Sequence, residues 1–255
     1  MKISQIICKT ALSKSNLPGL DYSLNPYRGC QHKCAYCYVP NVLRIKRSEW
    51  GSFVYVKKNI PIVLSKELRI KKPGIVAIST VTDPYQPVEK KFRLTRYCLE
   101  QLLIRDFPVC IQTKSDMITR DIDLISKFTK SEVMFSIATI NDSERKLLEP
   151  NAPSIQRRLN ALKSFSDLGI KTSIFFGPVY PTIKLKDLSN IIDVFIENGT
   201  KEIMVDKLNL KAGIKENVER FLKFKISKDL GNYESLNRSL FEIAKEKNIK
   251  IVNAF

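Results

Sequence analysis

The sequence predicts an α/β fold, a partial (β/α)6 open barrel with parallel strands. Apolar, β-branched runs alternate with amphipathic helical segments between residues 74 and 208, and this alternation implies parallel strands joined by right-handed crossovers. Polar residues gather where each predicted strand ends, at the edge where such sheets carry their sites. Five strands in this stretch and a sixth within residues 21–29 are fewer than the eight of a closed barrel.

The first predicted strand, "GIVAIST" at 74–80, is an apolar run that follows a glycine, as expected for a buried strand. Helix 90–107 places Leu99 and Leu102 on one stripe, and helix 153–170 has Ser154 as its N-cap and Gly169 as its stop. Apolar runs and helical periodicity predict the remaining elements, in chain order strand 107–113, helix 119–129, strand 131–139, strand 171–181, helix 185–200 and strand 201–208.

The domain organisation expected for 255 residues with 44% hydrophobic content is a single domain spanning residues 1–255. Its core should cover about 20–210, and 211–255 should form a C-terminal helical extension with a closing helix and a short strand. No apolar run approaches the roughly 18 residues of a membrane span. The N-terminal residues lack an apolar signal core, which indicates a cytoplasmic protein with no membrane partner.

The net charge of +17 is unevenly distributed along the chain. Residues 1–85 hold 14 Lys and Arg against 4 Asp and Glu, so this third contributes +10 of the total. A lysine-rich surface of a heat-adapted protein would be balanced by glutamate, and this one is not. The excess favours an anionic partner, nucleic acid first.

Three cysteines stand in the ten residues "GCQHKCAYCY", at C-x3-C-x2-C spacing: Cys30, Cys34 and Cys37. Three thiolates can hold three irons of a [4Fe-4S] cluster and leave the fourth iron open for a small molecule. The alternative is structural zinc with His32 or Cys8 as fourth ligand, although structural zinc usually uses two cysteine pairs. Cys98 and Cys110 lie in a predicted helix and strand and are expected to be buried core residues.

The cysteine motif, together with "NPYRGCQHKCAYCYVP", "TDPYQPVE", "TKSDMITRDIDLI" and "LEPNAPSIQRRLNALKSF", resembles the radical S-adenosylmethionine (radical SAM) superfamily. Within it, the chain is similar to the spore photoproduct lyase-like branch, also called DNA repair photolyase-like, over roughly residues 20–210. The resemblance implies a [4Fe-4S] cluster, S-adenosyl-L-methionine as second cofactor, and an electron donor such as a ferredoxin or flavodoxin. Reductive cleavage of S-adenosylmethionine would give a 5′-deoxyadenosyl radical that abstracts hydrogen from the substrate.

The same resemblance assigns Cys30, Cys34 and Cys37 to the cluster, and Tyr36 and Tyr38 to positions close to the cofactor. An aromatic ring such as that of Tyr36 suits packing near the adenine.

The strand ends supply the remaining cofactor-binding candidates that the resemblance implies. Thr80, Thr82 and Asp83 would meet the cofactor's amino group, since a carboxylate accepts hydrogen bonds from an ammonium. Lys114 would pair with the cofactor carboxylate, and Ser136 would contact the ribose. Arg158, or its neighbour Arg157, would form a second carboxylate contact.

One position departs from the lyase pattern. The lyases place a hydrogen-donating cysteine just after the second strand, where this chain has Thr80, preceded by Ser79. Repair of the spore lesion is therefore not expected, and catalytic residues beyond the cofactor site stay unassigned. Three hypotheses remain: a radical SAM enzyme acting on nucleic acid by DNA repair or base modification, one acting on a peptide or small metabolite, and a non-enzymatic iron–sulfur or zinc module that binds nucleic acid.

Overall fold

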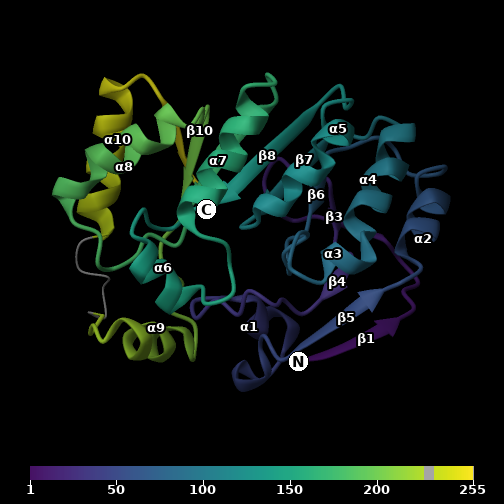
Figure 1. The fold of residues 1–255 in the computed structure, drawn as a ribbon, viewed down its shortest axis with the longest axis horizontal. Coiled ribbons are helices and arrows are strands. Elements are labelled where there is room, and N and C mark those ends of the chain that lie inside the picture. Colours follow the sequence, from purple (N-terminus) through teal and green to yellow (C-terminus); the bar gives the residue numbers. More distant parts are fainter. Residues whose placement is uncertain (227–232, 255) are drawn as a thin grey trace.

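Eight strands form the main sheet of the computed structural model, which describes residues 1–226 and 233–254 (Figure 1). Their order is β11-β10-β9-β8-β7-β6-β3-β2, and all neighbours are parallel except the β2–β3 pair at one edge. The strands of this sheet are β2 (Leu12–Lys14), β3 (Tyr22–Leu24), β6 (Val76–Ile78), β7 (Val109–Thr113), β8 (Ser131–Ser136), β9 (Lys171–Phe176), β10 (Glu202–Val205) and β11 (Lys250–Asn253).

The six predicted barrel strands are confirmed as β3 and β6–β10. β6 is buried at all three residues, as its uninterrupted apolar run predicts. Within the described part of the closing segment, β11 pairs in parallel with β10 and adds a seventh parallel strand. Residues 227–232 and 255 of that segment lie outside the described residues. β11 and β2 stand at opposite ends of the strand order, so the barrel is open.

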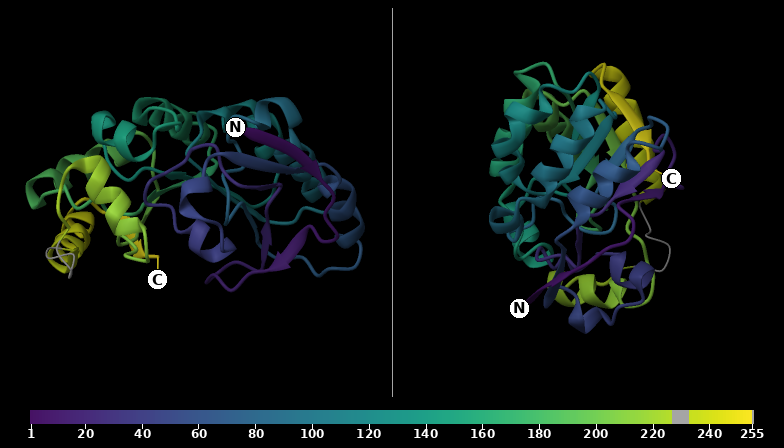
Figure 2. Two further views of the ribbon diagram at one scale, coloured as in Figure 1. Left: turned by 90° about the horizontal axis from the view of Figure 1, so that it is seen from below. Right: turned by 90° about the vertical axis from the view of Figure 1, so that its right-hand side faces the viewer.

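Helices pack around the sheet, as Figures 1 and 2 show. They are α1 (Val39–Leu43), α2 (Ile60–Glu67), α3 (Glu89–Phe92), α4 (Leu94–Ile104), α5 (Ile122–Ile125), α6 (Asp142–Leu148), α7 (Ile155–Ser166), α8 (Leu188–Glu197), α9 (Ile214–Leu222) and α10 (Tyr233–Glu246). The Ser154 hydroxyl accepts a hydrogen bond from the Arg157 N–H and caps α7, which confirms the predicted start of that helix. No described helix is long and apolar enough to cross a membrane.

Two predicted helices differ from the structure. The helix expected at 90–107 is broken at Arg93, whose φ is +52°, because the Glu89 carboxylate accepts the Thr95 N–H at 3.1 Å and starts α4 there. In place of the helix expected at 119–129, the chain forms a 3-10 helix, Asp116–Asp121, and then the single α-helical turn α5. Asp121 accepts bonds from Tyr85, Arg96 and Arg120, which fix this short connection in place.

A small second sheet, which the sequence did not predict, carries the approach to the cysteine motif. β1 (Lys2–Ile6) pairs in parallel with β5 (Phe53–Lys57), and β5 pairs with β4 (Tyr27–Arg28). β4 ends at Arg28, and the next residue, Gly29, has a φ of +93° and lies against the backbone of Phe53, directly before Cys30. The motif therefore leaves this sheet through a tight turn that only glycine accommodates.

A buried charge cluster fixes the other end of the motif. Glu149, which directly follows α6, accepts hydrogen bonds from the Tyr36 hydroxyl and the Arg158 guanidinium. Burial would raise the pKa of Glu149, but Arg158 and Lys114 outweigh burial and hold that pKa below its usual range. The Ala35 N–H also donates to the Leu148 carbonyl at 2.8 Å. The cysteine motif is thus attached to the α6–α7 connection.

Replacing Glu149 with glutamine should lower the free energy of unfolding by about 3–5 kcal/mol near neutral pH, because Arg158 loses its buried anionic partner. Since the folded-state pKa of Glu149 is depressed, its contribution is complete above the unfolded value of about 4.3 and is lost as the pH falls through the folded value. Denaturant unfolding of both proteins across this pH range measures the difference.

Glu100→Gln is the matched control for this variant. Glu100 pairs with Arg96 at 3.4 Å, but its side chain is 40% exposed, so the expected loss is below about 1 kcal/mol. Equal losses in the two variants would contradict the role given to Glu149.

Gly29→Ala should distort the start of the cysteine motif, because an added Cβ would lie 2.4 Å from the Phe53 carbonyl oxygen. Gly19→Ala is the control: its φ is +73°, yet nothing lies within 4 Å of the added carbon. Iron content after anaerobic reconstitution and the midpoint of thermal unfolding should fall much further in Gly29→Ala. A similar fall in both variants would mean that the positive φ, and not the contact with Phe53, causes the effect.

Candidate active site

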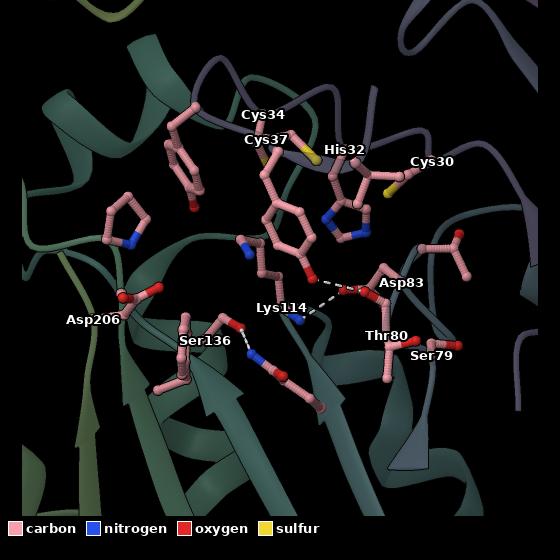
Figure 3. A pocket seen from close by; sticks show the side chains of 18 of the residues that line it. Cys30, His32, Cys34, Cys37, Ser79, Thr80, Asp83, Lys114, Ser136 and Asp206 are labelled. Atoms are coloured by element: carbon pink, nitrogen blue, oxygen red, sulfur yellow. Dashed lines mark hydrogen bonds between the residues drawn. The ribbon is translucent and has the colours of Figure 1, made fainter. Parts of the chain in front are cut away.

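A pocket lies at the carboxyl ends of the central strands, as expected for a sheet of this type. One wall is the cysteine loop, residues 30–39, and the opposite wall is formed by residues that end or follow β6, β7, β8, β9 and β10 (Figure 3). The structure brings ten of the eleven predicted site residues to this pocket: Cys30, Cys34, Tyr36, Cys37, Tyr38, Thr80, Thr82, Asp83, Lys114 and Ser136.

The three cysteines of the motif are free thiols in this pocket. Burial raises the pKa of all three, that of Cys34 to about 12, while Lys114 opposes the rise at Cys34 and Cys37. A thiol with a raised pKa stays protonated near neutral pH and becomes a thiolate when a metal replaces its proton. Cys98 is fully buried and Cys110 half-buried, and neither lines the pocket.

The three thiols come from one loop and line one pocket, where they could hold a [4Fe-4S] cluster. Among the described residues, no three His, Cys, Asp or Glu side chains converge where one metal ion could be held, as tetrahedral zinc requires. A [4Fe-4S] cluster instead takes each thiolate on a different iron. Cys8 lies away from the pocket, where its backbone N–H and carbonyl bond to Asn59. The structure thus does not bring Cys8 to the three cysteines, as one of the two zinc alternatives requires.

Lys114 provides a cation in the pocket. It follows β7, and its Nζ lies 5.7 Å from the centroid of the Tyr36 ring. Burial would lower the pKa of Lys114, but Cys34 and Glu149 reverse that effect and raise it. Ser136, at the end of β8, accepts a hydrogen bond from Gln112 at 3.1 Å. This wall thus presents one ammonium group and a hydroxyl–amide pair.

Asp83 has a structural task in addition to lining the pocket. One carboxylate oxygen accepts the Lys114 N–H at 2.8 Å, and the other accepts the Thr113 hydroxyl at 2.7 Å and the Tyr85 N–H at 2.9 Å. The segment after β6 is thereby tied to the end of β7. Lys114 is positioned by this contact.

Thr80 and Thr82 connect the same segment to the cysteine loop. The Thr82 hydroxyl donates to the Gly29 carbonyl at 2.6 Å, and the Tyr38 hydroxyl donates to the Thr80 carbonyl at 2.9 Å. The two walls of the pocket are therefore bonded directly to one another.

Arg158, the eleventh predicted residue, does not line the pocket. Its side chain is fully buried and is taken up by Glu149 and by the carbonyls of Ser136 and Pro153. Arg157 is exposed and pairs with Asp116 at 2.8 Å. Arg158 supports the strand end that carries Ser136, and the structure puts neither arginine in reach of a ligand in the pocket.

Sequence reasoning missed a set of unpaired polar atoms that face the pocket. Both ring nitrogens of His32, the indole nitrogen of Trp50 and the hydroxyl of Ser79 are buried without a hydrogen-bond partner in the described structure. Burial lowers the pKa of His32 and keeps the imidazole neutral. Buried polar groups are normally satisfied, so these atoms fit a pocket that receives a polar ligand. Their only sequence signal is that His32 and Trp50 are the sole residues of their types.

Known proteins match this chain in sequence. The sequence model of the Radical SAM superfamily matches residues 24–195. An uncharacterized protein of Methanocaldococcus jannaschii is 37% identical over 218 residues, covering 83% of this chain and 80% of the relative. The radical SAM Nalpha-GlyT isomerase of Pseudomonas phage M6 is 30% identical over 184 residues, which cover 71% of this chain and 38% of the phage protein.

Solved structures share the fold. Spore photoproduct lyase complexed with dinucleoside spore photoproduct has a TM-score of 0.74 at 14% identity, covering 99% of this chain and 82% of the lyase. Streptococcus suis SuiB bound to the precursor peptide SuiA has a TM-score of 0.57 at 16% identity, covering 99% of this chain and 48% of SuiB. The predicted partial barrel is thus confirmed. The chain is an enzyme of the radical SAM superfamily, whose members use a [4Fe-4S] cluster and S-adenosylmethionine.

Proposed function

We propose that this radical SAM enzyme acts on nucleic acid, in DNA repair or base modification. The observation that carries the proposal is a basic rim beside the pocket, made of residues 33–47 and 207–225. These two segments hold ten Lys and Arg against two Glu. Such a surface attracts phosphates.

The rim combines parts of the chain that are far apart in sequence. The Asn41 side chain donates to the Ala212 carbonyl at 3.3 Å, and the Arg47 side chain lies against Gly213. Figures 1 and 2 show α1 and α9 on the same side of the molecule. Each segment also lines the pocket, through Tyr38 and Lys207. A nucleic-acid strand bound to the rim would therefore lie next to the pocket.

Within the pocket we assign Cys30, Cys34 and Cys37 as the cluster ligands. When bound, the reduced cluster and S-adenosylmethionine supply one-electron radical chemistry to the substrate. Lys114 would hold the cofactor carboxylate as a point charge, because Cys34 and Glu149 keep it protonated. The rings of Tyr36 and Tyr38 would enclose the cofactor.

The strand ends would complete cofactor binding. Ser136 would contact the ribose, and Thr80 and Thr82 would lie near the amino group. Asp83 and Arg158 would act mainly by positioning Lys114 and Ser136, given the hydrogen bonds they already make.

The pocket also bears on the type of reaction. Among the described residues, its only cysteines are the three of the motif. Ser79 and Thr80 stand where a hydrogen-donating thiol would be needed, and hydroxyl O–H bonds are too strong for that task. Spore-lesion repair is therefore not the reaction we propose. We expect the enzyme to work in the cytoplasm, with a ferredoxin or flavodoxin as electron donor.

Alanine at Cys30, Cys34 or Cys37 should abolish the [4Fe-4S] cluster, whereas alanine at Cys98 or Cys110 should leave it intact. Of these five cysteines, Cys30, Cys34 and Cys37 line the pocket, and Cys98 and Cys110 do not. Iron and sulfide analysis of anaerobically reconstituted protein, together with the absorption near 400 nm (about the value for this cluster type), measures the result. Tetrahedral zinc with His32 as ligand in anaerobically purified protein would overturn the assignment.

Binding to single-stranded DNA or RNA should weaken when Lys46 and Lys211 of the rim are both changed to glutamate. Each phosphate contact contributes about 0.7 to the slope of log affinity against log salt for single strands, so the slope should fall by about 1.4. The control pair is Lys127→Glu with Lys130→Glu, two exposed lysines that precede the amino end of β8, whereas the pocket lies at the carboxyl ends of the strands. Fluorescence anisotropy measures both.

A base must be flipped or single-stranded to reach such a pocket, so intact duplex should bind less well than mismatched or single-stranded DNA. Deuterium transfer from labelled nucleic acid into 5′-deoxyadenosine is the decisive test of substrate. Absence of measurable binding at about 50 mM salt, where phosphate contacts are strong, would favour a peptide or small-metabolite substrate instead. Equal weakening by the control pair would remove the rim from the interface.

A further inference from the structure

Trp50, the only tryptophan of the chain, is packed beside the cysteine motif. It follows the 3-10 turn Arg47–Glu49 and is 3% exposed. Cys30 and Val39 are its buried neighbours, and Cys37 packs against the same group. Thirteen residues after the last cysteine, the chain thus returns an indole ring to the wall of the pocket.

The indole N–H of Trp50 makes no well-formed hydrogen bond within the described structure. A buried donor left unsatisfied costs about 1–3 kcal/mol. Its apolar neighbours, Leu43, Ile45 and Val81, offer no acceptor. The side-chain acceptors that this group contains are the sulfurs of Cys30 and Cys37.

The surroundings of Cys37 support this pairing. Burial raises the pKa of the Cys37 thiol, and this rise is opposed by the Val39 backbone N–H, by Lys114 and Arg47, and by the Trp50 side chain as a hydrogen-bond donor. Of the two sulfurs, that of Cys37, which packs against the ring, is therefore the better-placed acceptor.

We propose that the Trp50 indole N–H donates a hydrogen bond to the Cys37 sulfur once that thiolate is a cluster ligand, and that this bond makes the cluster easier to reduce. Reduction adds negative charge that spreads onto the ligand sulfurs, so a donor to sulfur stabilises the reduced state more than the oxidised state. Trp50 thus acts through the Cys37 sulfur, as a tuning residue. The inference rests on the assignment of Cys37 as a ligand.

Trp50→Phe keeps an aromatic ring and removes the N–H. A redox titration of the reconstituted cluster, followed by electron paramagnetic resonance without S-adenosylmethionine, should give a more negative midpoint potential in this variant. We expect the reduction equilibrium to shift by up to tenfold, which is 59 mV for one electron. Ile45→Val is the control, because Ile45 packs in the same apolar group without a polar atom, and its midpoint should match the wild type.

A second measurement needs no variant. Since the chain has one tryptophan, growth on indole-¹⁵N tryptophan labels Trp50 alone. Electron–nuclear double resonance of the reduced cluster should show a ¹⁵N coupling and an exchangeable proton coupling, and the proton coupling should be lost in Trp50→Phe.

The outcomes separate this inference from the proposed site. A Trp50→Phe protein that loads a full cluster with an unchanged midpoint, or a wild-type cluster without ¹⁵N coupling, overturns the hydrogen bond and leaves the ligand assignment standing. A Cys37→Ala protein that still holds the cluster overturns the assignment of Cys37 as a ligand, and the hydrogen bond with it.

Discussion

The ionised carboxylate of Glu149 is the contact on which the pocket depends. It is buried with Tyr36 from the cysteine loop and Arg158 from α7, and its charge also helps to keep Lys114 protonated. Burying these groups is costly, and their mutual attraction offsets the cost only while all are present. Two cations and one anion therefore fix the cysteine loop against the strand ends.

The main sheet could be predicted from sequence because its strands are buried on both faces. Each of β6 to β10 carries a run of apolar, mostly buried residues, and a helical period separates most of these runs, so the pattern indicates a parallel α/β sheet. The small sheet could not be predicted in this way. Its pairing joins residues 2–6 to residues 53–57, and β4 has only two residues, too few to show a period.

The candidate site was predictable to a similar degree. The cysteine spacing and the family resemblance together named ten residues that do line the pocket, and parallel strands bring those at their carboxyl ends to one edge. Arg158 was expected to contact the cofactor, but it does not line the pocket because its guanidinium is paired with the buried Glu149. Nothing in the sequence indicates that these two residues meet. His32, Ser79 and Trp50 were missed for the complementary reason: their unpaired atoms become visible only once burial and hydrogen bonding can be compared.

Arg47 belongs to the basic rim and also contacts the cysteine loop, so its charge acts on both. One of its guanidinium nitrogens donates to the Cys37 carbonyl at 2.9 Å, while the other donates to the exposed Asn41 side chain at 2.6 Å. Its positive charge favours an added electron at the adjoining sulfur, and an anion that settles beside it would cancel part of that field. Anion binding at the rim and reduction of the cluster are then thermodynamically linked. Because linkage is reciprocal, an anion that disfavours reduction must itself bind less tightly once the cluster is reduced, by the same factor.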